Sequence, residues 1–154
     1  MKNKYILTAI SAALLFLNPS CKDEQRCSVH PEAFRFSLID SETSQDLLYS
    51  GIYNKEDIAI YYFYNEERQD LLVNSEINPG NGLHEMVSAQ LPMISLTGRS
   101  DLFYLRLSQA ETDTLFVTVE RETREDCDYH PYTSVKHNWK EIPVTGGKSF
   151  ILYK

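Results

Sequence analysis

The chain contains no apolar run long enough to form a membrane-spanning helix. Its longest such run extends from Ile6 to Leu17 and is interrupted by Thr8 and Ser11. A helix needs roughly twenty apolar residues to cross a bilayer. A permanent transmembrane anchor is therefore not expected.

The usual catalytic motifs are also missing. The sequence has no G-x-S-x-G, no phosphate-binding glycine loop, no H-E-x-x-H and no calcium-loop spacing. Adjacent carboxylates such as Glu66 and Glu67 are typical of solvated turns, whereas a glycosidase needs two that face each other across a cleft. The sequence therefore predicts a protein that is not an enzyme and needs no cofactor.

Basic residues are scarce after the first twenty positions. The leader contains Lys2 and Lys4 and no acidic residue, so residues 21–154 carry 13 basic and 22 acidic side chains, a net charge of −9. Nucleic acids and anionic lipid headgroups would be repelled by this charge. Nucleic acid is therefore not an expected partner.

The first twenty residues are typical of a signal peptide, because positive charge precedes a short apolar run. The stretch that follows, Leu17-Asn18-Pro19-Ser20-Cys21, resembles the lipobox of bacterial lipoproteins, although its leucine lies one place early. The resemblance implies cleavage before Cys21 and a lipid such as palmitate on that cysteine. Ordinary signal-peptidase cleavage, which would leave Cys21 as a thiol, is the alternative.

The segment that follows Cys21 is short and charged. Residues 22–25 read Lys-Asp-Glu-Gln and resemble the acidic tethers that direct some Gram-negative lipoproteins to the cell surface. A plain solvated linker is the alternative. We therefore expect a leader over 1–20, a tether and lead-in segment over 21–32, one domain over 33–154, and an outer-membrane location that includes the cell surface.

Two cysteines remain for the folded domain, Cys27 and Cys127. An exported protein meets an oxidising compartment, in which such a pair tends to close. We therefore predict a disulfide between them, which would stabilise the fold by up to about 4–5 kcal/mol on the chain-entropy estimate.

Both cysteines begin a C-x-x-H-P segment, with the histidines at His30 and His130. Two thiolates and two imidazoles could close a tetrahedral metal site. A metal-handling protein built on Cys27, His30, Cys127 and His130 is therefore the alternative to the disulfide.

From residue 33 onward the dominant pattern is short runs of alternating apolar and polar residues, separated by turn-forming clusters. The pattern predicts about eight strands and almost no helix. The expected strands begin near Phe34, Ile58, Leu71, Met93, Leu102, Thr114, Ser134 and Ser149. Residues 83–90 are ambiguous, and the charged run 120–126 is expected to be a connection. An all-β, antiparallel β-sandwich follows, with a small closed barrel as the alternative.

Several segments resemble small uncharacterised lipoproteins of Gram-negative bacteria that carry an immunoglobulin-like or transthyretin-like sandwich. They are the stretches 36–40, 47–48 and 53–62, the strand opening at 113–115, the cysteine at 127, and the hairpin 135–140 with its turn at Asn138. The resemblance implies a location and a fold, and no reaction.

Aromatic residues give the remaining indication of function. Exposed rings can stack on sugars or anchor a protein interface, although tyrosine is also simply a good strand residue. Tyr132 and Trp139, near a late hairpin, are the expected ligand-stacking residues. The sequence thus predicts a lipid-anchored envelope module that binds or scaffolds an unknown protein or glycan.

Overall fold

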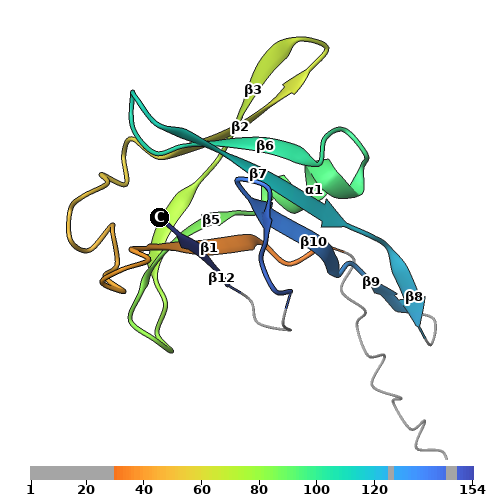
Figure 1. Ribbon diagram of the computed structural model, residues 1–154. Helices are drawn as coiled ribbons and strands as arrows, with labels where there is room; N and C mark the ends of the chain where they lie inside the picture. The colour runs from red at the N-terminus through yellow and green to blue at the C-terminus, as the bar shows by residue number, and fades with distance from the viewer. Residues whose placement is uncertain (1–29, 125–126, 145–148) are drawn as a thin grey trace, which may run out of the picture.

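The computed structural model describes residues 30–124, 127–144 and 149–154. Within these residues the chain forms twelve strands and one short helix (Figure 1). The elements are β1 (Phe34–Ile39), β2 (Ala59–Tyr64), β3 (Glu67–Leu71), β4 (Asn74–Ile77), β5 (His84–Ser88), α1 (Gln90–Leu96), β6 (Leu102–Arg106), β7 (Thr112–Val119), β8 (Glu122–Arg124), β9 (Cys127–Tyr129), β10 (Tyr132–His137), β11 (Lys140–Glu141) and β12 (Phe150–Tyr153).

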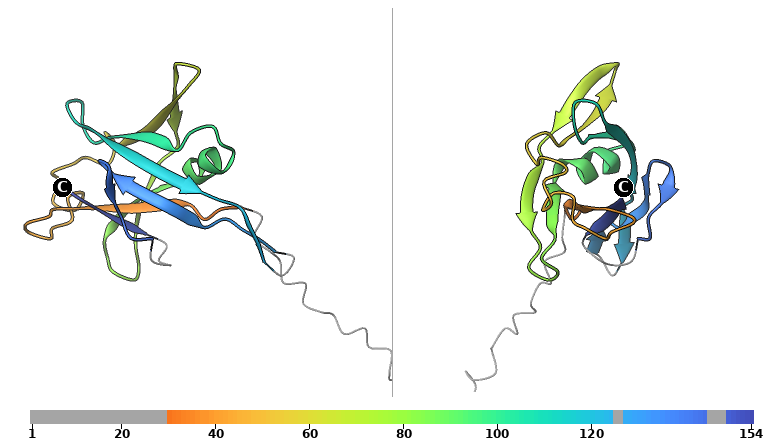
Figure 2. Two further views of the ribbon diagram at one scale, coloured as in Figure 1. Left: turned by 45° about the vertical axis from the view of Figure 1, so that its right-hand side comes forward. Right: turned by 60° about the vertical axis from the view of Figure 1, so that its left-hand side comes forward.

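Two sheets form a sandwich, which confirms the predicted all-β class. One sheet has the strand order β12-β1-β5-β4 and the other has the order β11-β10-β7-β6-β2-β3. Strands β8 and β9 form a separate small hairpin. The views in Figure 2 show the two layers and the β2–β3 hairpin, which projects beyond the rest of the molecule.

The core lies between the sheets and follows the alternation of the strands. Phe34, Phe36 and Leu38 of β1 point inward and are fully buried, as are Leu115 and Val117 of β7. Each of these residues lies two places from the next along its strand, as the two-residue period of a strand requires. The sequence pattern therefore identified the buried face of both strands.

The pairing of β1 with β12 is parallel, with Phe36 opposite Phe150. The remaining strand pairs in the described residues are antiparallel. The first and last strands of the described chain are therefore neighbours, so the final residue lies beside the loop that follows β1.

The predicted strand at 93–96 is wrong, because Gln90–Leu96 is the helix α1. Pro92 occupies the first turn, where its missing N–H costs nothing. Leu91 and Ser95 are both buried, and their spacing of four residues puts them on one face of a helix. A short apolar run cannot separate these two structures by its pattern alone.

Three other parts of the strand prediction need correction. The described chain has twelve strands where about eight were expected. The charged run 120–126 contains β8, which pairs with β9, and residues 84–88 of the ambiguous segment form β5. The strand that returns after β2 is β3, which begins at Glu67 rather than near Leu71.

Candidate functional site

Several connections and the final residue meet at one end of the sandwich, which we call the loop end. They are the loop 40–58, the β6–β7 turn 107–111, the β10–β11 turn 138–139 and Lys154. Arg106 Nε donates to the carbonyl of Asp57 (3.3 Å) and Ser41 N donates to the carbonyl of Lys154 (2.8 Å). In Figure 1 the loop after β1 and the C-terminal residue lie on the same side of the molecule.

The opposite end, which we call the N-terminal end, is where the described chain begins. It contains His30, the β8–β9 hairpin and the start of β10. The hydroxyl of Tyr132 donates to the carbonyl of Glu32 (2.6 Å), and Glu120 N donates to the carbonyl of Pro131 (3.2 Å). The two ends are thus separated by the length of β1 and β10.

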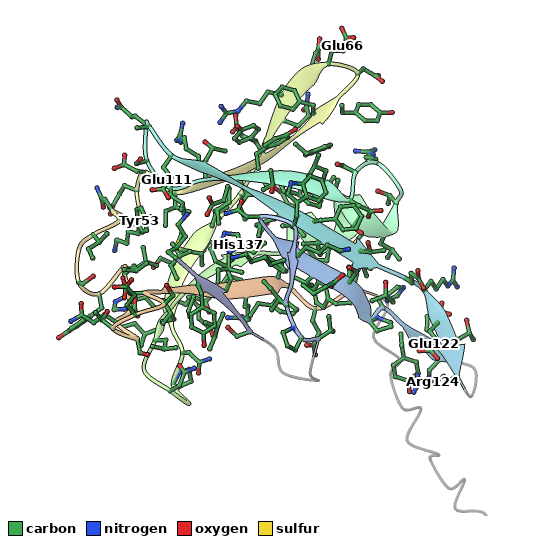
Figure 3. All side chains as sticks on the ribbon, viewed as in Figure 1. Tyr53, Glu66, Glu111, Glu122, Arg124 and His137 are labelled. Atoms are coloured by element: carbon green, nitrogen blue, oxygen red, sulfur yellow. The ribbon has the colours of Figure 1, made fainter. Side chains whose placement is uncertain are left out.

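A set of charged and polar side chains, linked by hydrogen bonds and ion pairs, lies at the loop end; we call it the Lys154 network. Lys154 Nζ lies 2.7 Å from both Asp113 Oδ2 and Glu111 Oε1. The same Asp113 oxygen is 2.7 Å from His137 Nε2, and the Tyr53 hydroxyl donates to Glu111 Oε2 (2.9 Å). Figure 3 shows Tyr53 and Glu111 close together, with His137 farther toward the middle of the sandwich.

Hydrogen bonds within the network favour the charged forms of Asp113 and Lys154 and the neutral form of Tyr53. Burial opposes the charge of Asp113, but hydrogen bonds from Lys154, Asn138 and His137 more than offset it and lower the pKa of that carboxyl. Burial likewise opposes the charge of Lys154, yet hydrogen bonds to Asp113 and Glu111 raise its pKa. Burial and the bond to Glu111 raise the pKa of Tyr53 to about 12.

The network is a structural device that joins elements of both sheets. Asp113 and His137 are only 6% and 7% exposed and belong to β7 and β10, while Lys154 follows β12 of the other sheet. Buried ions that find partners and hydrogen bonds are tolerated, and removing one partner leaves the others uncompensated. The loop 40–58 is attached to the Lys154 network through Tyr53, whose hydroxyl bonds Glu111.

His84, at the start of β5, is oriented by a carboxylate. Asp46 Oδ2 accepts a hydrogen bond from the backbone N of His84 (2.7 Å) and lies 3.2 Å from its Nδ1. The other oxygen accepts the backbone N–H groups of Leu48 and Tyr49. Burial raises the pKa of Asp46, but these hydrogen bonds outweigh that effect and the pKa is lowered.

This arrangement leaves one ring nitrogen of His84 for a ligand. A carboxylate that binds Nδ1 fixes the ring position and directs Nε2 away from itself. Within the part of the chain that the structure describes, Nε2 of His84 has no hydrogen-bond partner. The ring can therefore accept a hydrogen bond from a ligand when neutral, or donate one when protonated.

His84 lines a pocket of about 340 Å³ at the loop end. The other lining residues, which combine an apolar wall with amide, hydroxyl and ammonium groups, are Leu48, Gly51, Tyr53, Asn54 and Lys55. This volume is at the lower end of the range for small-molecule sites. The pocket fits a small polar ligand better than an extended apolar one, because most of its side chains can hydrogen-bond.

Two aromatic rings are strongly exposed at the loop end. Tyr49 is 81% exposed and its ring lies 5.8 Å from that of His84. Trp139 is 67% exposed and occupies the turn of the β10–β11 hairpin. The sequence singled out Trp139 as a ligand-stacking residue, and its position leaves the indole accessible.

The other predicted stacking residue, Tyr132, has a different environment. Its ring packs against Phe34 (6.0 Å between centroids) and Phe150 (5.4 Å) at the N-terminal end. Burial raises its pKa. Tyr132 thus packs against the core and is partly buried, and it lies at the other end of β10 from Trp139. A ligand-stacking role for Tyr132 stays a prediction.

A second aromatic group lies on the outer face of the six-stranded sheet. Tyr61 and Tyr104 stack across strands with centroids 5.2 Å apart, and the guanidinium of Arg68 lies 3.9 Å from the Tyr61 centroid. The ring of Tyr61 is therefore covered by two protein groups, and these contacts stabilise the surface of the sheet.

The predicted cysteine and histidine sites lie partly outside the described residues. Cys21 and Cys27 belong to the segment 1–29, so lipidation and the Cys27–Cys127 disulfide stay predictions. Cys127 begins β9, and His130 follows it with a buried Nδ1 that has no hydrogen-bond partner among the described residues. Among the described residues, no three His, Cys, Asp or Glu side chains are grouped as metal ligands.

Sequence reasoning missed Asp46, His84, Asp113 and Lys154. One signal was available for Asp113, which is in phase with the buried residues Leu115, Val117 and Val119 of β7. A carboxylate at an inward position needs a partner. The identity of that partner was not readable, because Lys154 lies 41 residues away.

Comparison with known proteins found no match. No family model matches the chain, and neither a curated protein nor a solved structure matches it. In the described residues, no helix has the length and apolar character needed to cross a membrane. The resemblance to envelope lipoproteins therefore stays a prediction from the sequence.

Proposed function

We propose that the chain is a lipid-anchored protein of the cell envelope that binds a ligand or partner at its loop end and is not an enzyme. One observation carries this proposal. The described chain begins at the N-terminal end, whereas the pocket and the exposed rings of Tyr49 and Trp139 lie at the opposite end. A module tethered through its N-terminus would thus hold its binding groups away from the membrane.

The electrostatics of the loop end support binding rather than catalysis. A general acid or base works best with a pKa near the operating pH. The pKa shifts of Asp113 and Lys154 lead away from neutrality, and that of Tyr53 reaches about 12. The Lys154 network is therefore better suited to fixing the loops than to transferring protons.

The proposal includes the disulfide between Cys27 and Cys127. The bond from the Tyr132 hydroxyl to the Glu32 carbonyl joins the segments that follow the two C-x-x-H-P sequences. Such contact supports an approach of the two cysteines. The bridge would fasten the lead-in segment to the N-terminal end.

The anchor is tested by mass spectrometry of the N-terminal peptide from native membranes. We expect a peptide that begins at Cys21 and carries diacylglyceryl and fatty acyl mass, which hydroxylamine and lipase treatment would reduce. A Cys21→Ser variant should be released from membranes. An intact leader, or a mature end without acyl mass, would contradict the anchor.

The binding site is tested by placing a photoreactive amino acid at position 49 or, as a matched control, at position 123. Both side chains belong to exposed segments, one at each end of the sandwich. We expect adducts in intact cells from position 49 and few from position 123. Adducts confined to position 123 would mean that the loop end is not the binding surface.

The alternative role in metal handling would use His130, whose buried Nδ1 lacks a hydrogen-bond partner in the part of the chain that the structure describes. Thiol titration of the purified, denatured chain separates the two hypotheses. No reactive thiol before reduction supports the disulfide. Two reactive thiols together with a stoichiometric bound metal support a site made by Cys27, His30, Cys127 and His130.

A further inference from the structure

The β10–β11 hairpin turns through two residues with left-handed backbone conformations. Asn138 has φ 47° and Trp139 has φ 67°. A two-residue hairpin loop with positive φ at both positions is a type I′ turn, which strongly prefers Asn followed by Gly. A bulky residue at the second position costs free energy, because its Cβ crowds the following carbonyl.

The contacts of the Trp139 ring do not offset this cost in free energy. Trp139 is 67% exposed, and within the described residues no aromatic or cationic side chain contacts its ring. The turn itself is firmly held, because Asn138 N donates to the carbonyl of Thr114 (2.9 Å) and Asn138 Oδ1 accepts the backbone N–H of Thr114 (2.9 Å). The indole is thus largely exposed on a firmly held turn.

The β2–β3 hairpin provides an internal comparison. Its turn residues, Asn65 and Glu66, have φ values of 51° and 67°, so the same turn is made with the same first residue. Glu66 is exposed and hydrophilic at the position that corresponds to Trp139. The turn geometry therefore requires no indole at this position. Strained residues of this kind concentrate at functional sites.

The surroundings of Trp139 favour a carbohydrate over a protein surface. Its neighbours Asn138, Lys140 and Glu141 are all exposed, and lysine and glutamate are depleted in protein interfaces. An exposed indole beside an ammonium group suits a ligand with an apolar ring face and hydroxyl edges. The ring of Tyr61, by contrast, is covered by Tyr104 and Arg68.

From these observations we infer that Trp139 stacks on the face of a pyranose ring, so that the ligand of the loop end is a glycan. Lys140, the next residue, is exposed, and its ammonium group can donate hydrogen bonds to the hydroxyl groups of that sugar. This inference rests on the proposed function, because it names the ligand class that the loop end binds. It goes beyond that proposal by assigning the contact to one strained residue.

The test uses the full, natively processed chain, applied in detergent to an array of immobilised bacterial and host oligosaccharides. Trp139→Gly should lose at least tenfold in signal on every oligosaccharide that retains the wild type, although Gly relaxes the turn and should keep or raise the unfolding temperature. Trp139→Phe should retain part of the signal. Glu66→Gly, the matched control, should bind as the wild type does.

The chain has a single tryptophan, so titration with a retained oligosaccharide can be followed by intrinsic fluorescence. We expect a blue shift of the emission, because stacking removes water from the indole. Equal retention of wild type and Trp139→Gly, or no retention of the wild type on any oligosaccharide, would overturn the inference. Loop-end adducts from position 49 together with acyl mass on Cys21 would, in that event, leave the proposed function standing.

Discussion

The two ends of the sandwich are stabilised by different physical means. At the N-terminal end, Phe34, Tyr132 and Phe150 form an aromatic cluster in which Phe34 and Phe150 stack with centroids 5.1 Å apart. The ion pairs there, such as Glu122–Arg124, lie on the surface. At the loop end, the carboxylate of Asp113 is itself buried, and its bonds to His137 and Lys154 connect β7 with β10 and with the residue that follows β12.

The difference follows from composition. The loop after β1 begins with seven polar residues, 40–46, and reaches the core only in its later part, through Leu47 and Ile58. Hydrogen bonds and charges from Asp46, Tyr53 and the Lys154 network add to this attachment. Apolar packing is insensitive to pH and salt, whereas bonds between ions are not. The two ends should therefore lose their structure under different conditions of pH and salt.

The largest effect is expected from Phe34→Ala at the N-terminal end. The ring is fully buried and contacts Phe36, Tyr132 and Phe150, so its loss removes apolar contacts and leaves a cavity. We expect a loss of about 3–5 kcal/mol in the free energy of unfolding, equal at pH 4 and pH 7. Urea unfolding at both values measures it. A loss that changed markedly with pH would contradict the assignment of this end to apolar packing.

The second-largest loss in the free energy of unfolding is expected from Asp113→Ala at the loop end. This change removes the carboxylate that Lys154 and His137 share. Breaking a buried ion pair in this way should cost about 2–4 kcal/mol. Glu122→Gln, which breaks an exposed pair at the other end, is the matched control and should change stability little. Figure 3 shows how far Glu122 and Arg124 lie from His137. Equal losses in the two variants would remove the proposed distinction between the ends.

The longer strands could be predicted from the sequence, whereas the shortest ones could not. The alternating runs that begin at Phe34 and Thr114 predicted β1 and β7 with their buried faces, because the core face of a strand repeats every second residue. The continuous apolar run from Ile58 predicted β2. The short segments β4, β8, β9 and β11 have too few residues to show a period. Their pairing is decided by neighbours rather than by their own pattern.

The candidate site was less accessible to sequence reasoning than the fold. Trp139 could be singled out by residue type, and Asn138 identified the turn. The bonds from Asp113 to His137 and Lys154 span 24 and 41 residues, and that from Tyr53 to Glu111 spans 58. Nothing in a single sequence indicates which distant polar residues will meet, so the Lys154 network and the Asp46–His84 pair appeared only with the structure.

A smaller change in stability is expected when the pH is varied. The pKa values of Asp46 and Asp113 are lower in the folded chain than the ordinary value of 3.8. Their contribution to stability is therefore complete above about pH 4 and is lost as the pH falls through the folded values. The pKa of Lys154 is raised above 10.5, so its contribution is lost only as the pH rises through that higher value.

Amide hydrogen exchange across the acid range can locate this loss. We expect protection in 46–58 and 111–115 to fall before protection in β1 and the start of β10, and Asp113→Ala should flatten the dependence. The exposed carboxylates Glu122 and Asp128 also have lowered pKa values. Their effect should disappear in about 0.5 M salt, which screens surface charges more than buried ones. Uniform loss of protection at both ends would show that the loop end has no separate sensitivity to acid.

The smallest effect compares the two strained hairpins, and its sign is opposite to the others. Glu66 has a φ of 67°, and a glycine Cα fits this conformation without the clash that a Cβ causes. Glycine also increases the entropy of the unfolded chain, which offsets part of the gain. Glu66→Gly should therefore stabilise the protein by about 0.5 kcal/mol, measured as a rise in the urea midpoint at constant slope. A similar rise in Trp139→Gly would show that the indole is retained at a cost to stability, whereas a fall would mean that it contributes to folding after all.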